Sequence, residues 1–155
     1  MKKEEILKKL SETASRYKLS GYHCSESVIR ALNDVFELKL SPETIRAACG
    51  FRGGGGGYRD RCGILESGCM VISVLYGRDD LEKEAWTYSY LIRVLHRRFA
   101  DHFGSIYCRD IYAKQKAMNV PNTCHDPVVE GSVLIGELLL EAEELLKNAP
   151  EEEKN

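Results

Sequence analysis

Apolar residues recur every three or four positions along almost the whole chain, the spacing of amphipathic α-helices. The first such segment has apolar residues at positions 6, 7, 10, 14 and 17 and ends at Gly21. A second begins around Cys24, and Ser41 with Pro42 supplies the N-cap and first position of a short third helix that ends at Cys49. No segment carries a convincing strand pattern. The chain is therefore predicted to be all-α.

Residues 62–76 are apolar on nearly every side of the predicted helix. Their apolar members are Ile64, Leu65, Met70, Val71, Ile72, Val74 and Leu75. A helix without a polar face is usually buried. We therefore expect this segment to form the central helix of the fold.

Three further helices are predicted in the second half of the chain. Their expected N-caps are Asp79 or Asp80 for the longest helix, Ser105 for a short one, and Asp126, followed by Pro127, for the last. The result is a compact bundle of six or seven helices around the buried helix at about 62–76. We expect one domain over residues 1–149 and an acidic, frayed tail over 150–155.

Composition narrows the classes of function. The chain has 155 residues, enough for one domain with a hydrophobic core, and a formal net charge of −2. That charge gives no reason to expect nucleic acid or an anionic membrane as a partner. The N-terminus has the pattern of a charged amphipathic helix rather than a signal peptide, and no apolar run is long enough to span a bilayer. We expect a cytoplasmic protein without membrane insertion.

Six cysteines then need an explanation. In a reducing cytosol, cysteines remain thiols, bind metals or take part in redox chemistry. No Cys-x-x-Cys pair occurs, which argues against a zinc ribbon and a thioredoxin-type site. The haem-attachment motif Cys-x-x-Cys-His is also absent.

The stretch from Cys49 to Cys69 carries the most unusual pattern. It contains three of the six cysteines and five consecutive glycines, Gly53, Gly54, Gly55, Gly56 and Gly57. Ordering five glycines costs much chain entropy, so such a loop suits a place where backbone passes close to another group or must stay mobile. Cys62 follows the loop at the start of the buried helix, where the helix dipole favours a thiolate. We therefore expect a thiolate site for a metal, a cluster or redox chemistry.

Four cysteines lie at or near predicted helix starts: Cys24, Cys62, Cys108 and Cys124. If those starts converge, their unpaired N–H groups and positive dipole ends face one anionic object. Four thiolates around iron and sulfide, or around zinc, are such objects. Four arginines near these positions would offset negative charge: Arg52, Arg59, Arg61 and Arg109.

The remaining candidates have weaker arguments. N–H groups of the loop Gly53–Gly57 can reach the sulfurs of a cluster and raise its reduction potential. His23 and His125 flank two of the cysteines and are weaker candidates as ligands. We interpret Cys49 and Cys69 as small hydrophobic residues without a role as ligands.

The order of these motifs resembles a known family. Cys24 is followed by Gly-Phe-x-Gly-Gly-Gly at 50–55, then by Cys62-Gly63, Tyr76-Gly77, Phe103-Gly104-Ser105, Cys108-Arg109 and Cys124. Over roughly residues 20–146 this order resembles the C_GCAxxG_C_C family. Those are small proteins of anaerobic bacteria and archaea, regarded as redox-active and named for four cysteines and a Cys-Gly-Ala-x-x-Gly motif.

The resemblance implies that Cys24, Cys62, Cys108 and Cys124 are the four family cysteines. A related domain is similar to the N-terminal part of split-Soret cytochromes, where an iron–sulfur site has been inferred. Only the iron–sulfur part of that similarity applies to this chain, because the haem-attachment motif is absent. This chain departs from the family motif at Ile64, which replaces alanine, and at Ser67, which replaces the second glycine. Bulkier side chains there would change how closely another helix packs.

Three functions stay open at this point. The first is an electron-transfer or redox-sensing protein with a [2Fe–2S] or [4Fe–4S] cluster on the four cysteines. The second is a metal-free thiol–disulfide oxidoreductase or sensor in which Cys62 attacks as thiolate and one of the other three cysteines resolves. The third is a structural zinc protein, although zinc ligands usually come in close pairs and these four span about a hundred residues.

The expected partner is another redox protein. The sequence leaves open whether the chain is itself an enzyme. A role as the electron carrier of an oxidoreductase is compatible with the pattern. The pattern is also compatible with a homodimer that shields the cluster at its interface, although no residue demands one.

Overall fold

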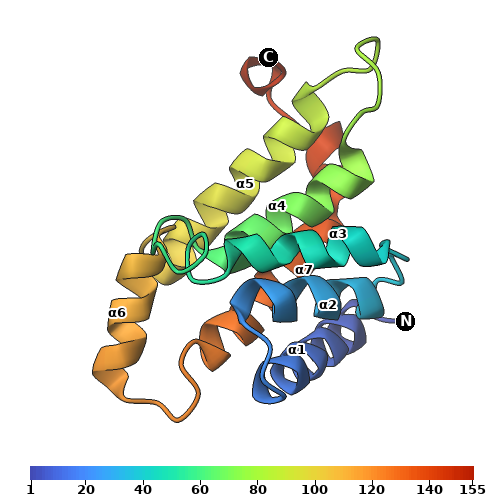
Figure 1. The fold of residues 1–155 in the computed structure, drawn as a ribbon. Helices are drawn as coiled ribbons and strands as arrows, with labels where there is room; N and C mark the ends of the chain where they lie inside the picture. Colours follow the sequence, from blue (N-terminus) through green and yellow to red (C-terminus); the bar gives the residue numbers. More distant parts are fainter.

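The computed structural model describes residues 1–155 and is all-α, as predicted (Figure 1). It contains the α-helices α1 (Lys3–Leu19), α2 (Cys24–Val35), α3 (Pro42–Ala47), α4 (Gly63–Tyr76), α5 (Trp86–Phe103), α6 (Cys108–Met118) and α7 (His125–Lys147), and the short 3₁₀ helices η1 (Ala48–Phe51) and η2 (Glu151–Glu153). None of these helices has the length and apolar character needed to cross a membrane.

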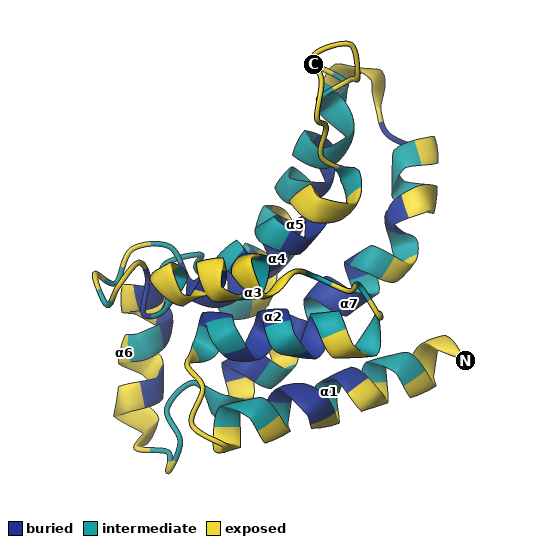
Figure 2. Cartoon of the chain, turned by 45° about the vertical axis from the view of Figure 1, so that its right-hand side comes forward, coloured by how far each residue is buried: buried dark blue, intermediate teal, exposed yellow.

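Helix α4 is the central element, as its apolar pattern predicts. It packs against α2, α5 and α7, and its residues Ile64, Leu65, Val71 and Ile72 are buried. Helix α1 closes the bundle against α2 and α7. Helix α6 stands beside this bundle, with buried positions on its inner side and exposed ones on its outer side (Figure 2).

Glycines on α7 allow two of its neighbours to come very close. A Cβ atom added at Gly131 would lie 2.4 Å from Cγ2 of Ile64 on α4, and one added at Gly136 would lie 2.5 Å from Cδ2 of Leu10 on α1. Both distances are far shorter than a van der Waals contact. The close approach holds the first half of α7 beside the start of α4.

The start of α5 differs from the prediction. We expected Asp79 or Asp80 to cap this helix, but α5 begins at Trp86. The Asp80 carboxylate instead accepts hydrogen bonds from the backbone N–H groups of Glu82 and Lys83, at 2.9 and 3.3 Å. Aspartate readily makes such local turns, which compete with helix formation. As a result α7, with 23 residues, is the longest helix and α5, with 18, is shorter.

The last two helices also begin at other residues than predicted. Helix α6 starts at Cys108 itself, and Cys124 is the N-cap of α7. Ser105 does not cap α6, because its hydroxyl accepts from the Tyr107 N–H within the preceding turn. Asp126 lies within the first turn of α7 instead of capping it. Both cysteines therefore sit closer to a helix start than the sequence suggested.

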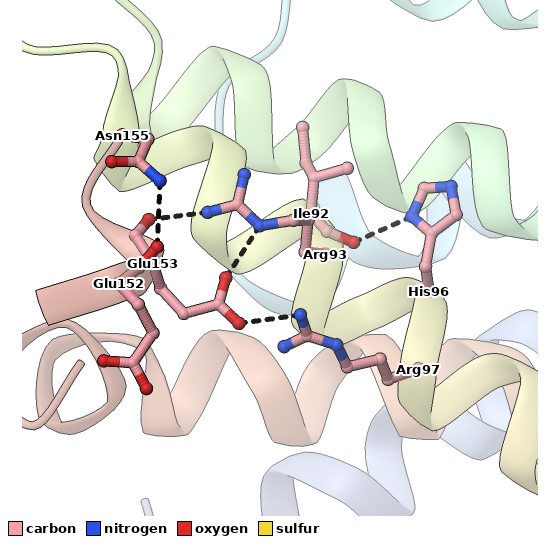
Figure 3. Close-up of polar contacts among 7 residues, drawn as sticks. All are labelled: Ile92, Arg93, His96, Arg97, Glu152, Glu153 and Asn155. Carbon is pink, nitrogen blue, oxygen red and sulfur yellow. Dashed lines mark hydrogen bonds and ion pairs between the residues drawn. The ribbon is translucent and has the colours of Figure 1, made fainter. Parts of the chain in front are cut away.

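The C-terminal tail is folded against α5 instead of fraying. The Glu153 carboxylate accepts a hydrogen bond of 2.9 Å from Arg93 Nε and one of 2.7 Å from Arg97 Nη2 (Figure 3). Arg93 also donates to the Glu153 backbone carbonyl at 2.6 Å. Composition predicts fraying because the tail is acidic. The fold places two arginines one turn apart on α5, and these arginines hold the tail.

Replacing Glu153 by glutamine should release the tail. Hydrogen bonds from Arg97 and Arg93 hold the pKa of Glu153 below its usual 4.5. A lowered pKa means that this contact stabilises the fold at neutral pH and is lost as the pH falls through the folded-state pKa. We expect faster amide exchange over residues 149–155 in the variant at neutral pH, and the same change in the wild-type protein only in acid.

Glu152→Gln is the matched control, since the Glu152 side chain points away from both arginines in Figure 3. Equal exchange in the two variants would contradict this account of the tail.

Candidate functional site

Four cysteines line one cavity of about 400 Å³. Each belongs to a different helix start: Cys24 is the first residue of α2, Cys62 the N-cap of α4, Cys108 the first residue of α6, and Cys124 the N-cap of α7. The structure thus brings together the four cysteines that the sequence singled out. No three histidine, cysteine, aspartate or glutamate side chains are close enough together to hold a single metal ion in this structure.

The other two cysteines lie outside the cavity. Cys49 is exposed, and its sulfur lies 3.8 Å from Oε2 of Glu26. Cys69 is half-buried against the hydrophobic core, and this burial raises the pKa of its thiol to about 12. Neither residue contributes to the cavity.

A short antiparallel ladder fixes the spacing of Cys62 and Cys108. The Cys62 N–H donates to the Ile106 carbonyl at 2.9 Å, and the Cys108 N–H donates to the Asp60 carbonyl at 2.6 Å. The segment before α4 is therefore tied to the segment before α6, which places two helix starts side by side (Figure 1).

The five glycines form an ordered loop with a left-handed backbone. Their φ angles run from 57° to 92°, a region in which side chains other than glycine are strained. The N–H groups of Gly55, Gly56 and Gly57 donate to carbonyls of residues 50–52. These three N–H groups are thus used within the loop, and of the five glycines only Gly53 lines the cavity.

The first two glycines bring backbone directly against two of the cysteines. Gly53 and Cys24 both line the cavity, and the Gly53 backbone lowers the pKa of the Cys24 thiol, although burial raises it by more. A Cβ added at Gly54 would lie 2.7 Å from Cβ of Cys108 and 2.5 Å from the Asp60 nitrogen. The loop therefore acts as a close-fitting wall behind the cavity.

Gly63, directly after Cys62, is needed for a similar reason. A Cβ at this position would lie 2.6 Å from the Phe51 carbonyl oxygen and 3.0 Å from the Cys24 sulfur. The absence of a side chain lets the start of α4 approach both η1 and the start of α2.

Three cations line the cavity, and no aspartate or glutamate does: Lys18, Arg52 and Arg59. Arg59 Nη1 donates to the Cys108 sulfur at 3.5 Å, and its guanidinium lies 3.7 Å from the centre of the Tyr112 ring. Lys18 Nζ donates to Asn122 Oδ1 at 2.7 Å. The wall of the cavity is consequently positively charged.

The other two arginines from the sequence analysis lie outside the cavity. Arg61 pairs with Glu66 at 2.8 Å and contacts His96 Nε2 at 2.5 Å. Arg109 is exposed and lies 3.7 Å from the Asp60 carboxylate. Neither arginine therefore places its charge in the lining of the cavity.

Burial, and not the helix dipole, dominates the acidity of the thiols. Burial raises the pKa of Cys24 and of Cys62, and raises that of Cys124 to about 11. Backbone N–H groups at the start of α4 lower the pKa of Cys62, but by less than burial raises it. The expectation that Cys62 favours the thiolate is therefore wrong for the protein alone.

The two candidate histidines have different environments. His23 lines the cavity. His125 does not, because its Nε2 lies 2.7 Å from the Ser15 hydroxyl and its Nδ1 lies 2.8 Å from the Asp126 carboxylate. His125 thus ties the start of α7 to α1.

The cavity is also lined by Lys18, Tyr112 and Asn122, to which no sequence pattern points. Lys18 stands near the end of an amphipathic helix that carries several other lysines, so no spacing distinguishes it. Asn122 lies in the loop before α7, whose path is set only by tertiary contacts.

A family model described as "Putative redox-active protein (C_GCAxxG_C_C)" matches residues 22–138. The chain belongs to this family. The match spans the four cysteines, the glycine loop and helices α2 to α6. Comparisons with curated proteins and with solved structures found no match.

The two departures from the C_GCAxxG_C_C motif are accommodated by neighbouring residues. Ile64 stands where the motif has alanine, and its extra bulk fits against the bare backbone of Gly131 on α7. Ser67 stands where the motif has its second glycine, and its buried hydroxyl donates to the Ser25 carbonyl at 2.7 Å. Both substitutions thus pack without opening the site.

Replacing Gly63 by alanine should destabilise the site and the fold together. The new Cβ would force the Phe51 carbonyl and the Cys24 sulfur to move, and overpacking of this kind costs about 1–3 kcal/mol. Urea unfolding measures the loss. Gly50→Ala is the control, because a Cβ there meets nothing within 4 Å. A Gly63→Ala variant as stable as this control would contradict the close approach.

Proposed function

We propose that this protein is a redox protein that holds an iron–sulfur cluster on Cys24, Cys62, Cys108 and Cys124 and acts in electron transfer or redox sensing. One observation carries the proposal: thiols from four separate helix starts line the same cavity. Membership of a family described as redox-active supports it.

The lining suits such a group in its donor set, its volume and its charge. Cysteine thiolates are the usual ligands of iron–sulfur clusters. A cavity of about 400 Å³ exceeds by far the ~30 Å³ that one water molecule occupies. Four thiolates with iron and sulfide carry net negative charge, which the three lining cations offset.

The chain's own residues would hold and tune the group. The Arg59 guanidinium donates to the Cys108 sulfur, and the backbone of Gly53 lines the cavity with Cys24. Donors to ligand sulfurs and limited access of water set the potential of a cluster. Ile64 and Ile111 supply apolar lining that limits water. When bound, a cluster of this kind supplies one-electron exchange.

Anaerobic purification followed by iron, sulfide and zinc analysis tests the proposal. We expect brown protein with iron and acid-labile sulfide. Cys→Ser variants at positions 24, 62, 108 and 124 should each lose most of the visible absorbance. Cys49→Ser and Cys69→Ser are the controls and should keep it, because neither lines the cavity.

Two outcomes would overturn the cluster proposal. Zinc without iron would indicate a structural metal site. Metal-free protein whose cavity thiols oxidise reversibly in pairs would indicate thiol–disulfide chemistry.

Arg59 should raise the reduction potential of the site. Reduction adds negative charge, which the guanidinium beside Cys108 stabilises. We expect Arg59→Asn to make the potential more negative, as followed by a spectroscopic redox titration. Asparagine is chosen because Arg59 has a φ of 66°, a conformation that asparagine tolerates.

Arg109→Asn is the matched control for Arg59→Asn. It removes the same charge from the residue next to Cys108, but Arg109 lies outside the cavity. Equal shifts in the two variants would show that the hydrogen bond from Arg59 to the sulfur has no special effect.

A further inference from the structure

The charges of the chain are unevenly distributed about the cavity. Residues 46–62 contain four arginines and one aspartate, and residues 108–124 contain one arginine, two lysines and one aspartate. Residues 126–155 instead contain nine acidic residues and two lysines. Helix α7 starts at the cavity and runs about 34 Å away from it over 23 residues. The two segments that carry Cys62, Cys108 and Cys124 are therefore net basic, although the net charge of the whole chain is −2.

Tyrosines and cations are paired on the surface next to Cys108. The Arg109 guanidinium lies 4.2 Å from the centre of the Tyr107 ring, and Lys116 Nζ lies 5.9 Å from that of Tyr112, which also stacks on Arg59. Tyr58, at the end of the glycine loop, is 85% exposed. We call this set the tyrosine–cation patch: Tyr58, Arg59, Tyr107, Arg109, Tyr112 and Lys116.

We propose that the tyrosine–cation patch docks a small acidic electron-carrier protein, an inference that rests on the proposed function. Tyrosine and arginine are enriched at protein interfaces and among the residues that dominate binding energy. The exposed Tyr58, Arg109 and Lys116, together with the half-buried Tyr107 and Tyr112, thus form a surface with the composition of a docking site.

The position of the patch suits electron exchange. Arg59 contacts both the Cys108 sulfur and the Tyr112 ring, so the patch reaches a proposed cluster ligand through one side chain. A carrier seated there would lie close to the cavity that these cysteines line.

Charge selects the kind of partner. A basic face on a protein of negative net charge attracts an acidic partner in one orientation only, which steers the encounter toward the cavity. Interfaces between redox proteins are small and transient, so electrostatic steering contributes much of their specificity.

Binding of a ferredoxin, a small acidic iron–sulfur carrier, tests the proposal. The full-length protein is immobilised, and ferredoxin binding is followed by biolayer interferometry from ~20 to ~300 mM salt, over which surface charges become screened. We expect affinity to fall steeply with salt. The double variant Arg109→Glu/Lys116→Glu on α6, which changes two exposed cations of the patch, should weaken binding by at least ~10-fold at low salt. Tyr58→Ala should weaken it without changing the salt dependence.

Lys8→Glu/Lys9→Glu on α1 is the matched control. Both lysines are exposed, the change in net charge is the same, and the N-terminal part of α1 lies on the other side of the molecule from α6 (Figure 1). We expect this variant to bind ferredoxin nearly as the wild-type protein does.

An equal loss of ferredoxin affinity in the two double variants would overturn the proposal, because it would show that binding depends on net charge and not on the tyrosine–cation patch. So would an absence of ferredoxin binding, with or without binding of duplex DNA or of vesicles containing anionic lipid. Iron and sulfide are measured on the same samples. A protein that lacks the cluster but shows the expected ferredoxin binding would overturn the proposed function alone. A protein that holds the cluster but does not show this binding would overturn only the docking surface.

Discussion

Burying four thiols around one cavity is the constraint on which the rest of the structure depends. Burial raises the pKa values of Cys24, Cys62 and Cys124, which makes thiolates at these positions costly in the protein alone. The fold places four helix starts, the Arg59 guanidinium and two further cations around a lining without carboxylates. These features suit the proposed cluster, which would keep its four ligands anionic.

Helix packing and glycine placement serve this arrangement. The bare backbone of Gly131 lets α7 approach α4, and Gly63 lets the start of α4 reach η1 and Cys24. The ladder between the segments before α4 and α6 fixes Cys62 relative to Cys108. Each of these approaches depends on the lack of a Cβ atom or on backbone hydrogen bonds within the fold.

Cations are found both inside the cavity and on the surface around it. Cations inside the cavity offset the charge of thiolates, and cations on its rim give the surrounding surface its sign. Arg59 belongs to both sets, because it contacts the Cys108 sulfur and stacks on the surface residue Tyr112. One side chain thus connects the proposed redox centre with the proposed docking surface.

The sequence by itself determined what depends on local interactions. Helical periodicity identified α4 as the central helix, and four cysteines at helix starts, with their family resemblance, marked the residues of the cavity. Tertiary structure decided the rest. Asp80 forms a turn instead of capping α5, Glu153 docks on two arginines, and Arg59 rather than Arg109 turns toward a cysteine. These outcomes rest on contacts between residues distant in sequence or on competing local hydrogen bonds, and neither periodicity nor composition encodes which contact wins.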